Sequence, residues 1–161
     1  MKIRKTAKVA LMLMLSFGCS KNSGQEDIEV VNKFEMEVQE ILARNDSILN
    51  MDRLTRFDWE DLFIFKPYTS IDEINSKLGY KWEEAESTFI NVKDDFNLLV
   101  FTEGGRVIKF ARLSREHGDF SRMEMTGPFK RGQSAFVLKR DSVGMQPWLF
   151  IYEFPSRNGV D

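Results

Sequence analysis

The chain has 161 residues, which suits one domain, and 42% of them are hydrophobic while 30% are charged. Its 14 phenylalanines and 3 tryptophans exclude a disordered protein. A chain with this many aromatic residues can bury enough apolar surface on folding to offset the conformational entropy that it loses. The net charge is −2, and without the four positive charges of the first eight residues it is near −6. This balance argues against a nucleic-acid-binding protein and is compatible with a cationic partner.

The first nineteen residues have the organisation of an export signal. Residues 1–8 carry four positive charges and no acid, residues 9–17 form an apolar run, and Gly18 precedes Cys19. The run is too short for a transmembrane helix, which needs about 20 residues. We therefore predict cleavage of a signal peptide, residues 1–18, between Gly18 and Cys19.

Residues 1–20 resemble the signal of the bacterial lipoprotein class, which ends in a lipobox before an acylated cysteine. Gly18 and Cys19 match that motif, whereas Ser16 stands where leucine is usual and Phe17 is bulky. The sequence Ser16-Phe17-Gly18 also fits ordinary signal peptidase, which would release a soluble exported protein. Cys19 is the only cysteine and has no internal disulfide partner, which favours its lipidation.

The resemblance implies a lipid-anchored protein of the bacterial cell envelope, with the membrane as a partner. Its place would be the periplasmic face of the outer membrane in a Gram-negative cell, or the outer face of the plasma membrane in a Gram-positive one. Residues 19–27 are polar after the cysteine and suit a flexible tether. Residues 28–161 are predicted to form a single domain.

Two helices are predicted in the first half of this domain. Apolar residues recur at three- and four-residue spacing over 28–42, a pattern that could extend to Leu49. A short buried strand is expected at 62–65. The second helix begins with a capping box, formed either by Ser70 and Glu73 or by Thr69 and Asp72, and it ends at Gly79.

The second half is predicted to be β-structure. Strands are expected at residues 88–92, 96–101, 106–113, 135–138 and 147–152, with a hairpin turn at 103–105 and a long loop at 114–132. Tight links between successive strands favour antiparallel pairing. The predicted fold class is α+β: an N-terminal helix, a short strand, a second short helix, and a mainly antiparallel sheet of four to five strands.

Aromatic residues beside acids suggest a recognition surface. Trp59, Tyr68 and Trp82 flank the first strand and the second helix, and Phe129 lies in the long loop. Such residues dominate protein interfaces, although they could instead close the core of a small sheet. The acidic run at 83–86 is either a solvated loop or part of a surface for a basic partner.

No motif for catalysis, metal binding or a cofactor was found. His117 with Asp119 could form a general base and its orienting acid, but no partner nucleophile is signalled. One histidine and one cysteine cannot build a zinc site, and the acids lack the spacing of a calcium loop. The alternative to a non-enzymatic protein is a small envelope hydrolase that uses Glu60, Asp61 or Asp119.

We therefore expect a membrane-anchored binding module without enzymatic activity. In architecture it resembles envelope-assembly accessories and the lipoproteins that inhibit enzymes attacking the cell wall. A protein partner in the envelope is expected, and nucleic acid is not.

Overall fold

The computed structural model describes residues 24–124 and 127–154; the predicted signal peptide, Gly18 and Cys19 lie outside these ranges. In the described part of the chain, no helix is long and apolar enough to cross a membrane. The elements in chain order are β1 (Gln25–Glu26), α1 (Ile28–Ala43), β2 (Ile48–Asn50), the 3-10 helix η1 (Met51–Arg53), β3 (Asp61–Phe65), α2 (Ile71–Leu78), the 3-10 helix η2 (Glu83–Thr88), β4 (Phe96–Glu103), β5 (Arg106–Ser114), β6 (Phe129–Lys130), β7 (Ala135–Val143) and β8 (Gln146–Glu153).

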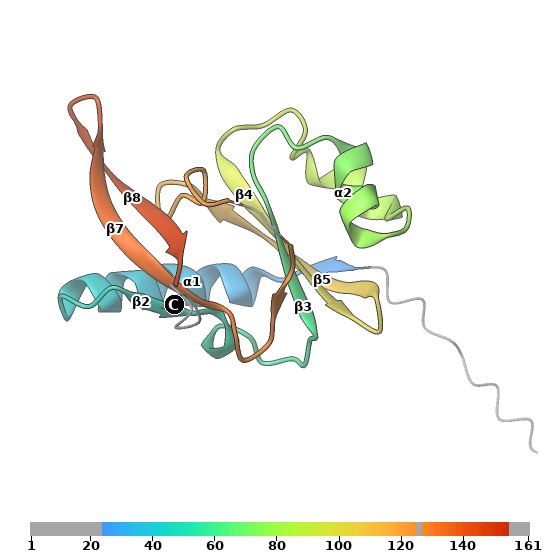
Figure 1. The fold of residues 1–161 in the computed structure, drawn as a ribbon, viewed down its shortest axis with the longest axis horizontal. Coiled ribbons are helices and arrows are strands. Elements are labelled where there is room, and N and C mark those ends of the chain that lie inside the picture. The colour runs from blue at the N-terminus through green and yellow to red at the C-terminus, as the bar shows by residue number, and fades with distance from the viewer. Residues whose placement is uncertain (1–23, 125–126, 155–161) are drawn as a thin grey trace, which may run out of the picture.

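The strands form two sheets, which confirms the predicted α+β class (Figure 1). The larger sheet has the order β1-β5-β4-β3-β6, and only the β1–β5 pair is parallel. The smaller sheet has the order β2-β7-β8 and is antiparallel. The larger sheet is the mainly antiparallel sheet expected from the sequence. The C-terminal strands do not belong to it: β7 pairs with β2, and β8 pairs with β7.

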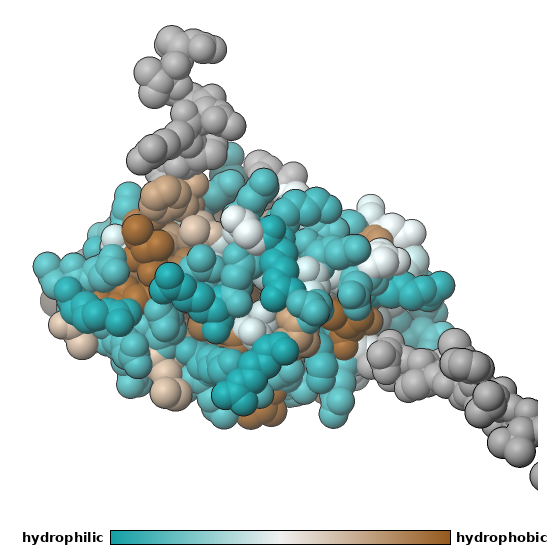
Figure 2. All heavy atoms as spheres, turned by 90° about the horizontal axis from the view of Figure 1, so that it is seen from below, coloured by the Kyte–Doolittle hydropathy of each residue, from teal (hydrophilic) through white to brown (hydrophobic). Residues whose placement is uncertain are grey.

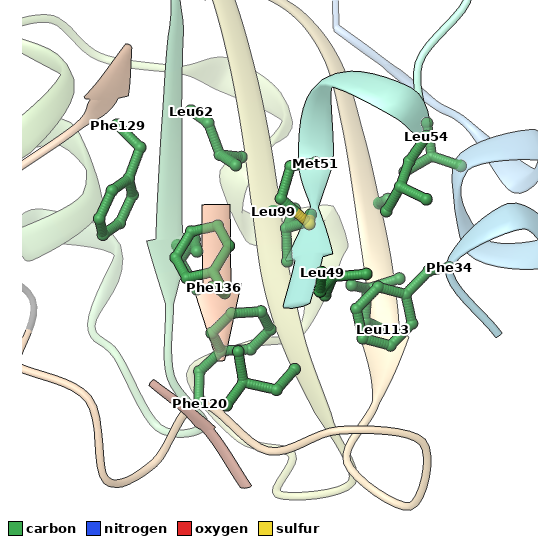
Figure 3. Close-up of a cluster of buried hydrophobic side chains, with 14 of the residues drawn as sticks. Phe34, Leu49, Met51, Leu54, Leu62, Leu99, Leu113, Phe120, Phe129 and Phe136 are labelled. Atoms are coloured by element: carbon green, nitrogen blue, oxygen red, sulfur yellow. The ribbon is translucent and has the colours of Figure 1, made fainter. Parts of the chain in front are cut away.

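Strand β4 is the centre of the larger sheet, and seven of its eight residues are buried. Its successive side chains point to opposite faces, so that Leu99 and Phe101 join one hydrophobic cluster and Leu98 and Val100 join another. The first cluster is closed by α1 and the smaller sheet, and Figure 3 shows its side chains. The second is closed by α2 and η2. Both faces of the sheet are thus covered.

Helix α1 begins at the N-cap Asp27, whose carboxylate accepts a hydrogen bond from the Val30 amide at 3.1 Å. It ends at Ala43, because Asn45 has a positive φ of 55° and the chain then enters β2. The expected helix over residues 28–42 is confirmed, and its possible extension to Leu49 does not form. The buried stripe of the helix consists of Val30, Phe34, Val38 and Ile41.

The residues directly before α1 belong to the sheet. Gln25 and Glu26, which the sequence analysis placed in the tether, pair as β1 with Lys109 and Phe110 of β5. The Glu26 carboxylate accepts two hydrogen bonds of 2.7 Å from the guanidinium of Arg112. This bidentate pair and the β1–β5 ladder fix the point at which the chain enters the fold.

Helix α2 confirms its predicted capping. The Ser70 hydroxyl accepts a hydrogen bond from the Glu73 amide at 3.2 Å, and Gly79 ends the helix with a φ of 79°. The predicted strand at 88–92 is wrong, since η2 and a turn occupy this stretch. The Thr88 hydroxyl donates to the Ala85 carbonyl at 2.6 Å, and such a local hydrogen bond competes with extended backbone.

Candidate functional site

The four aromatic residues predicted as a binding surface do not share one. Trp59, Trp82 and Phe129 are 3%, 3% and 9% exposed, whereas Tyr68 is 62% exposed. Trp59 and Phe129 belong to the first hydrophobic cluster and Trp82 to the second, on the other face of the sheet. Three of these rings therefore close the core, as the alternative interpretation had it, and only Tyr68 is exposed at the surface.

The three carboxylates considered for hydrolysis are held separately. Glu60 accepts a hydrogen bond from the Gly104 amide at 2.9 Å, and Asp61 forms an ion pair of 2.6 Å with Lys130. Both residues lie at the start of β3. Asp119 instead lies against β8, where it forms a bridge with Phe150.

The predicted pair of His117 and Asp119 is not formed. The Nδ1 atom of His117 lies 3.1 Å from the Glu35 carboxylate of α1. Asp119 is 1% exposed and accepts hydrogen bonds from the Arg115 guanidinium at 2.8 Å and from the Trp148 indole at 3.0 Å. Burial by itself would raise the pKa of Asp119. The hydrogen bonds from Arg115 and from the Ser121 amide outweigh it and lower this pKa below its usual range.

Over residues 24–124 and 127–154, no three His, Cys, Asp or Glu side chains gather as metal ligands would. Asp94 and Asp95, which are adjacent in sequence, are both exposed before β4.

The most unusual exposed feature is a group of three apolar side chains, Tyr68, Phe89 and Val92, which we call the aromatic face. They are 62%, 52% and 61% exposed. The Tyr68 amide donates a hydrogen bond to the Ile90 carbonyl at 2.8 Å, which brings the β3–α2 loop beside the η2–β4 loop. Both loops lie at the top of Figure 1.

Two residues of the aromatic face occupy backbone positions that favour glycine. Tyr68 has a φ of 63° and follows Pro67 in a turn closed by the Thr69 amide and the Lys66 carbonyl at 3.2 Å. Phe89 has a φ of 60° at the end of η2. This left-handed conformation costs an L-residue roughly 1–2 kcal/mol, and the exposed rings recover little of it by burial. Folding alone does not account for aromatic residues here.

Acidic side chains border the aromatic face along the chain. We call them the acidic rim: Glu83, Glu84, Glu86, Asp94 and Asp95. In the described part of the chain, none of these carboxylates lies within 4.0 Å of a lysine, arginine or histidine nitrogen. Lys93 is the only basic residue between positions 83 and 95. The face therefore combines exposed rings with negative charge.

The sequence analysis named Tyr68 and the acidic run at 83–86 but missed Phe89 and Val92, which it placed in a strand. A signal was present, because Phe89 follows directly on a stretch of acids and small polar residues that is poor in strand formers. Comparison with protein-family models, with curated proteins and with solved structures finds no match for this chain.

Replacing Tyr68 or Phe89 by glycine is expected to change the free energy of unfolding by less than about 1 kcal/mol. Relief of the left-handed strain offsets the greater conformational freedom that glycine gives the unfolded chain. Urea unfolding of the single variants and of the double variant measures this. The control Phe65→Ala, which truncates a buried ring, should lose about 3–5 kcal/mol. A similar loss in the glycine variants would show that the exposed rings serve folding.

Replacing Asp119 by asparagine is expected to lower the free energy of unfolding at pH 7 by about 1.5–3 kcal/mol, because Arg115 loses its charged acceptor. The pKa of Asp119 is lower in the folded than in the unfolded protein, so its stabilisation is complete above the unfolded value near 3.9. The difference between wild type and variant should thus be constant from about pH 7 to 5 and shrink as the pH falls below about 4.

Urea unfolding at a series of pH values tests this dependence. The matched control is Asp58→Asn, which removes a carboxylate that is 89% exposed and should change stability by less than about 1 kcal/mol. A difference between wild type and Asp119→Asn that grows on acidification would contradict the ionised state of Asp119.

Proposed function

We propose that this chain is a membrane-anchored binding module of the bacterial envelope, and that its aromatic face docks a basic segment of a protein partner. The single observation that carries the docking is the placement of Tyr68 and Phe89, two exposed rings held in a strained backbone conformation. Strain that folding does not repay is characteristic of functional sites. Tyrosine, together with tryptophan and arginine, is enriched among the residues that dominate protein interfaces.

The acidic rim supports a cationic partner. Five carboxylates border the rings, and in the described residues none of them has an ion-pair partner. A basic segment would gain long-range attraction to this negative field during its approach. Its apolar side chains would then cover Tyr68, Phe89 and Val92 and remove them from water.

The anchor supports an envelope location. Cys19 is separated from Gly24 by four residues, so its Cα lies at most about 17 Å from the start of the described fold. β1 then joins the chain firmly to β5. A lipid on Cys19 would therefore hold the whole domain close to the membrane surface. Stable attachment needs more than one acyl chain, which the lipoprotein pathway supplies.

Inhibition of lipoprotein signal peptidase in cells is expected to cause a larger, uncleaved precursor of the full chain to accumulate, because Cys19 would be the residue after the cut. Immunoblotting of treated and untreated cells measures the size. Replacing Cys19 by serine should make processing insensitive to the inhibitor. An unchanged gel position of the wild type under the inhibitor would contradict the anchor.

Docking is tested with an eight-residue labelled peptide of alternating leucine and lysine, by fluorescence anisotropy at low salt. The triple variant Glu86→Gln/Asp94→Asn/Asp95→Asn should weaken binding about three- to tenfold, since each exposed charge pair contributes up to about 1 kcal/mol. The double variant Tyr68→Gly/Phe89→Gly should weaken it similarly or more. Added salt should weaken wild-type binding.

Two matched controls make this measurement specific. The triple variant Glu37→Gln/Glu40→Gln/Asp58→Asn removes the same charge elsewhere and should leave the affinity unchanged. A peptide with glutamate in place of lysine should not bind. Equal weakening by both triple variants would show that net charge, and not the aromatic face, attracts the peptide.

A further inference from the structure

The β7–β8 hairpin extends beyond the body of the domain as an arm, which we define as residues 139–148 (Figure 1). Strand β2 pairs with residues 135–137 of β7, and the Leu138 amide donates to the Ser47 carbonyl at 2.7 Å. Beyond this point two side chains tie the arm to the body of the domain: Asp141 pairs with Arg122, and the Trp148 indole donates to Asp119. Residues 139–143 are all exposed. A ribbon of two strands without a covered face is only marginally stable in water.

The tip of the arm is apolar. Met145 is 98% exposed and Val143 is 54% exposed. The turn itself needs Gly144, which has a φ of 64°, but it places no demand for an apolar side chain on the next position. Residues 142–148 carry no charge, so the tip can enter an apolar site without the cost of desolvating an ion.

The root of the same arm borders an apolar hollow of about 490 Å³ between α1 and β8. Its apolar wall consists of Val38, Leu42, Pro147, Trp148 and Leu149. Glu116, His117 and Arg140 stand at its polar side. Figure 2, which views the molecule from below, shows apolar surface interrupting the hydrophilic covering at the end of the molecule that carries the arm.

The Trp148 ring in the wall of this hollow is held in place by hydrogen bonds. The Trp148 indole donates to the Asp119 carboxylate at 3.0 Å, and the same carboxylate is bound by Arg115. Asp119 also joins β8 through its backbone, with the Ile151 amide donating to its carbonyl at 2.8 Å. A fixed aromatic wall suits a methionine, whose sulfur makes favourable contacts with aromatic rings.

We infer that two copies of this chain associate through their arms, with Met145 of each copy seated in the hollow of the other. The tip cannot fill its own hollow, because the β7–β8 ladder is continuous to the Val143–Gln146 pair and holds the arm extended. Met145 and Leu149 are four residues apart on one strand, about 13 Å. When two arms lie antiparallel across a two-fold axis, the tip of each arm reaches the root of the other. One symmetric contact therefore places both Met145 side chains in the two hollows.

This pairing uses none of the three residues of the aromatic face, although Arg115 links the two regions by donating to the Asp94 carbonyl and to the Asp119 carboxylate, each at 2.8 Å. The arm and the hollow belong to α1 and the smaller sheet, whereas Tyr68 and Phe89 lie on loops at the side of α2 and η2. A dimer of this kind leaves both aromatic faces open and presents two of them to a partner.

Cysteine crosslinking in cells that produce the full-length chain tests the contact. The double variant Met145→Cys/Gln39→Cys places one thiol at the tip and one at the rim of the hollow, and a short bifunctional maleimide should yield a covalent dimer. The control Met145→Cys/Val92→Cys, with its second thiol on the aromatic face, should yield none. Cys19 is common to both variants, and its acylation would leave it no free thiol to react. No dimer from the first pair, equal dimer from both, or adducts of the tip only with another protein would overturn the inference.

Sedimentation equilibrium of the purified full-length protein in detergent provides the second measurement. The wild type should be a dimer, and Met145→Glu should raise its dissociation constant at least about tenfold without changing its thermal unfolding, because Met145 touches little in its own chain. Val92→Glu introduces the same charge and should leave the dimer unchanged. A wild type that is monomeric at every concentration, or a Met145→Glu variant that dimerises as well as the wild type, would overturn the inference.

Discussion

The burial of β4 on both faces is the constraint on which the rest of the structure depends. A strand of this kind needs an apolar layer on each side, and the chain supplies the two layers from different parts of its sequence. α1 and the smaller sheet, from the two ends of the domain, cover one face, while the short α2 and η2 cover the other. The loops that join α2 and η2 to the larger sheet carry the aromatic face, and the hairpin turn between β7 and β8 carries the apolar tip of the arm.

The aromatic face shows a conflict between stability and exposure. Glycine is the residue with the least strain at the positions of Tyr68 and Phe89, and polar side chains would be better solvated there. The chain has large rings at both positions and sets unpaired carboxylates beside them. The arm presents the same conflict in another form, because Met145 is almost fully exposed in a turn that requires only its neighbouring glycine. We propose that contacts with other molecules account for both.

Local signals in the sequence were sufficient for the α+β class, for α1, and for the capping of α2 by Ser70 and Gly79. They were insufficient for the strand at 88–92, because the hydrogen bonds of Thr88 override a β-branched and aromatic composition. Pairing of β7 with β2 depends on contacts between distant residues, which no short pattern records. The aromatic face was found only in part for the same reason: Tyr68 and Ile90 are distant in sequence and meet through one backbone hydrogen bond. Trp59 and Trp82 were predicted as surface residues because they stand beside acids in the sequence. In the structure both are buried, one in each of the two hydrophobic clusters.

The central claim is that the aromatic face is covered in the cell and bare in the isolated protein. It is tested most directly by replacing Phe89 with cysteine in the full-length chain and comparing its rate of maleimide labelling in intact cells and after purification. Met36→Cys, on an α1 position that is 61% exposed, is the reference thiol. The account predicts that, relative to Met36→Cys, the cysteine at position 89 is labelled much more slowly in cells than in the purified protein. Equal relative rates in the two settings would contradict it.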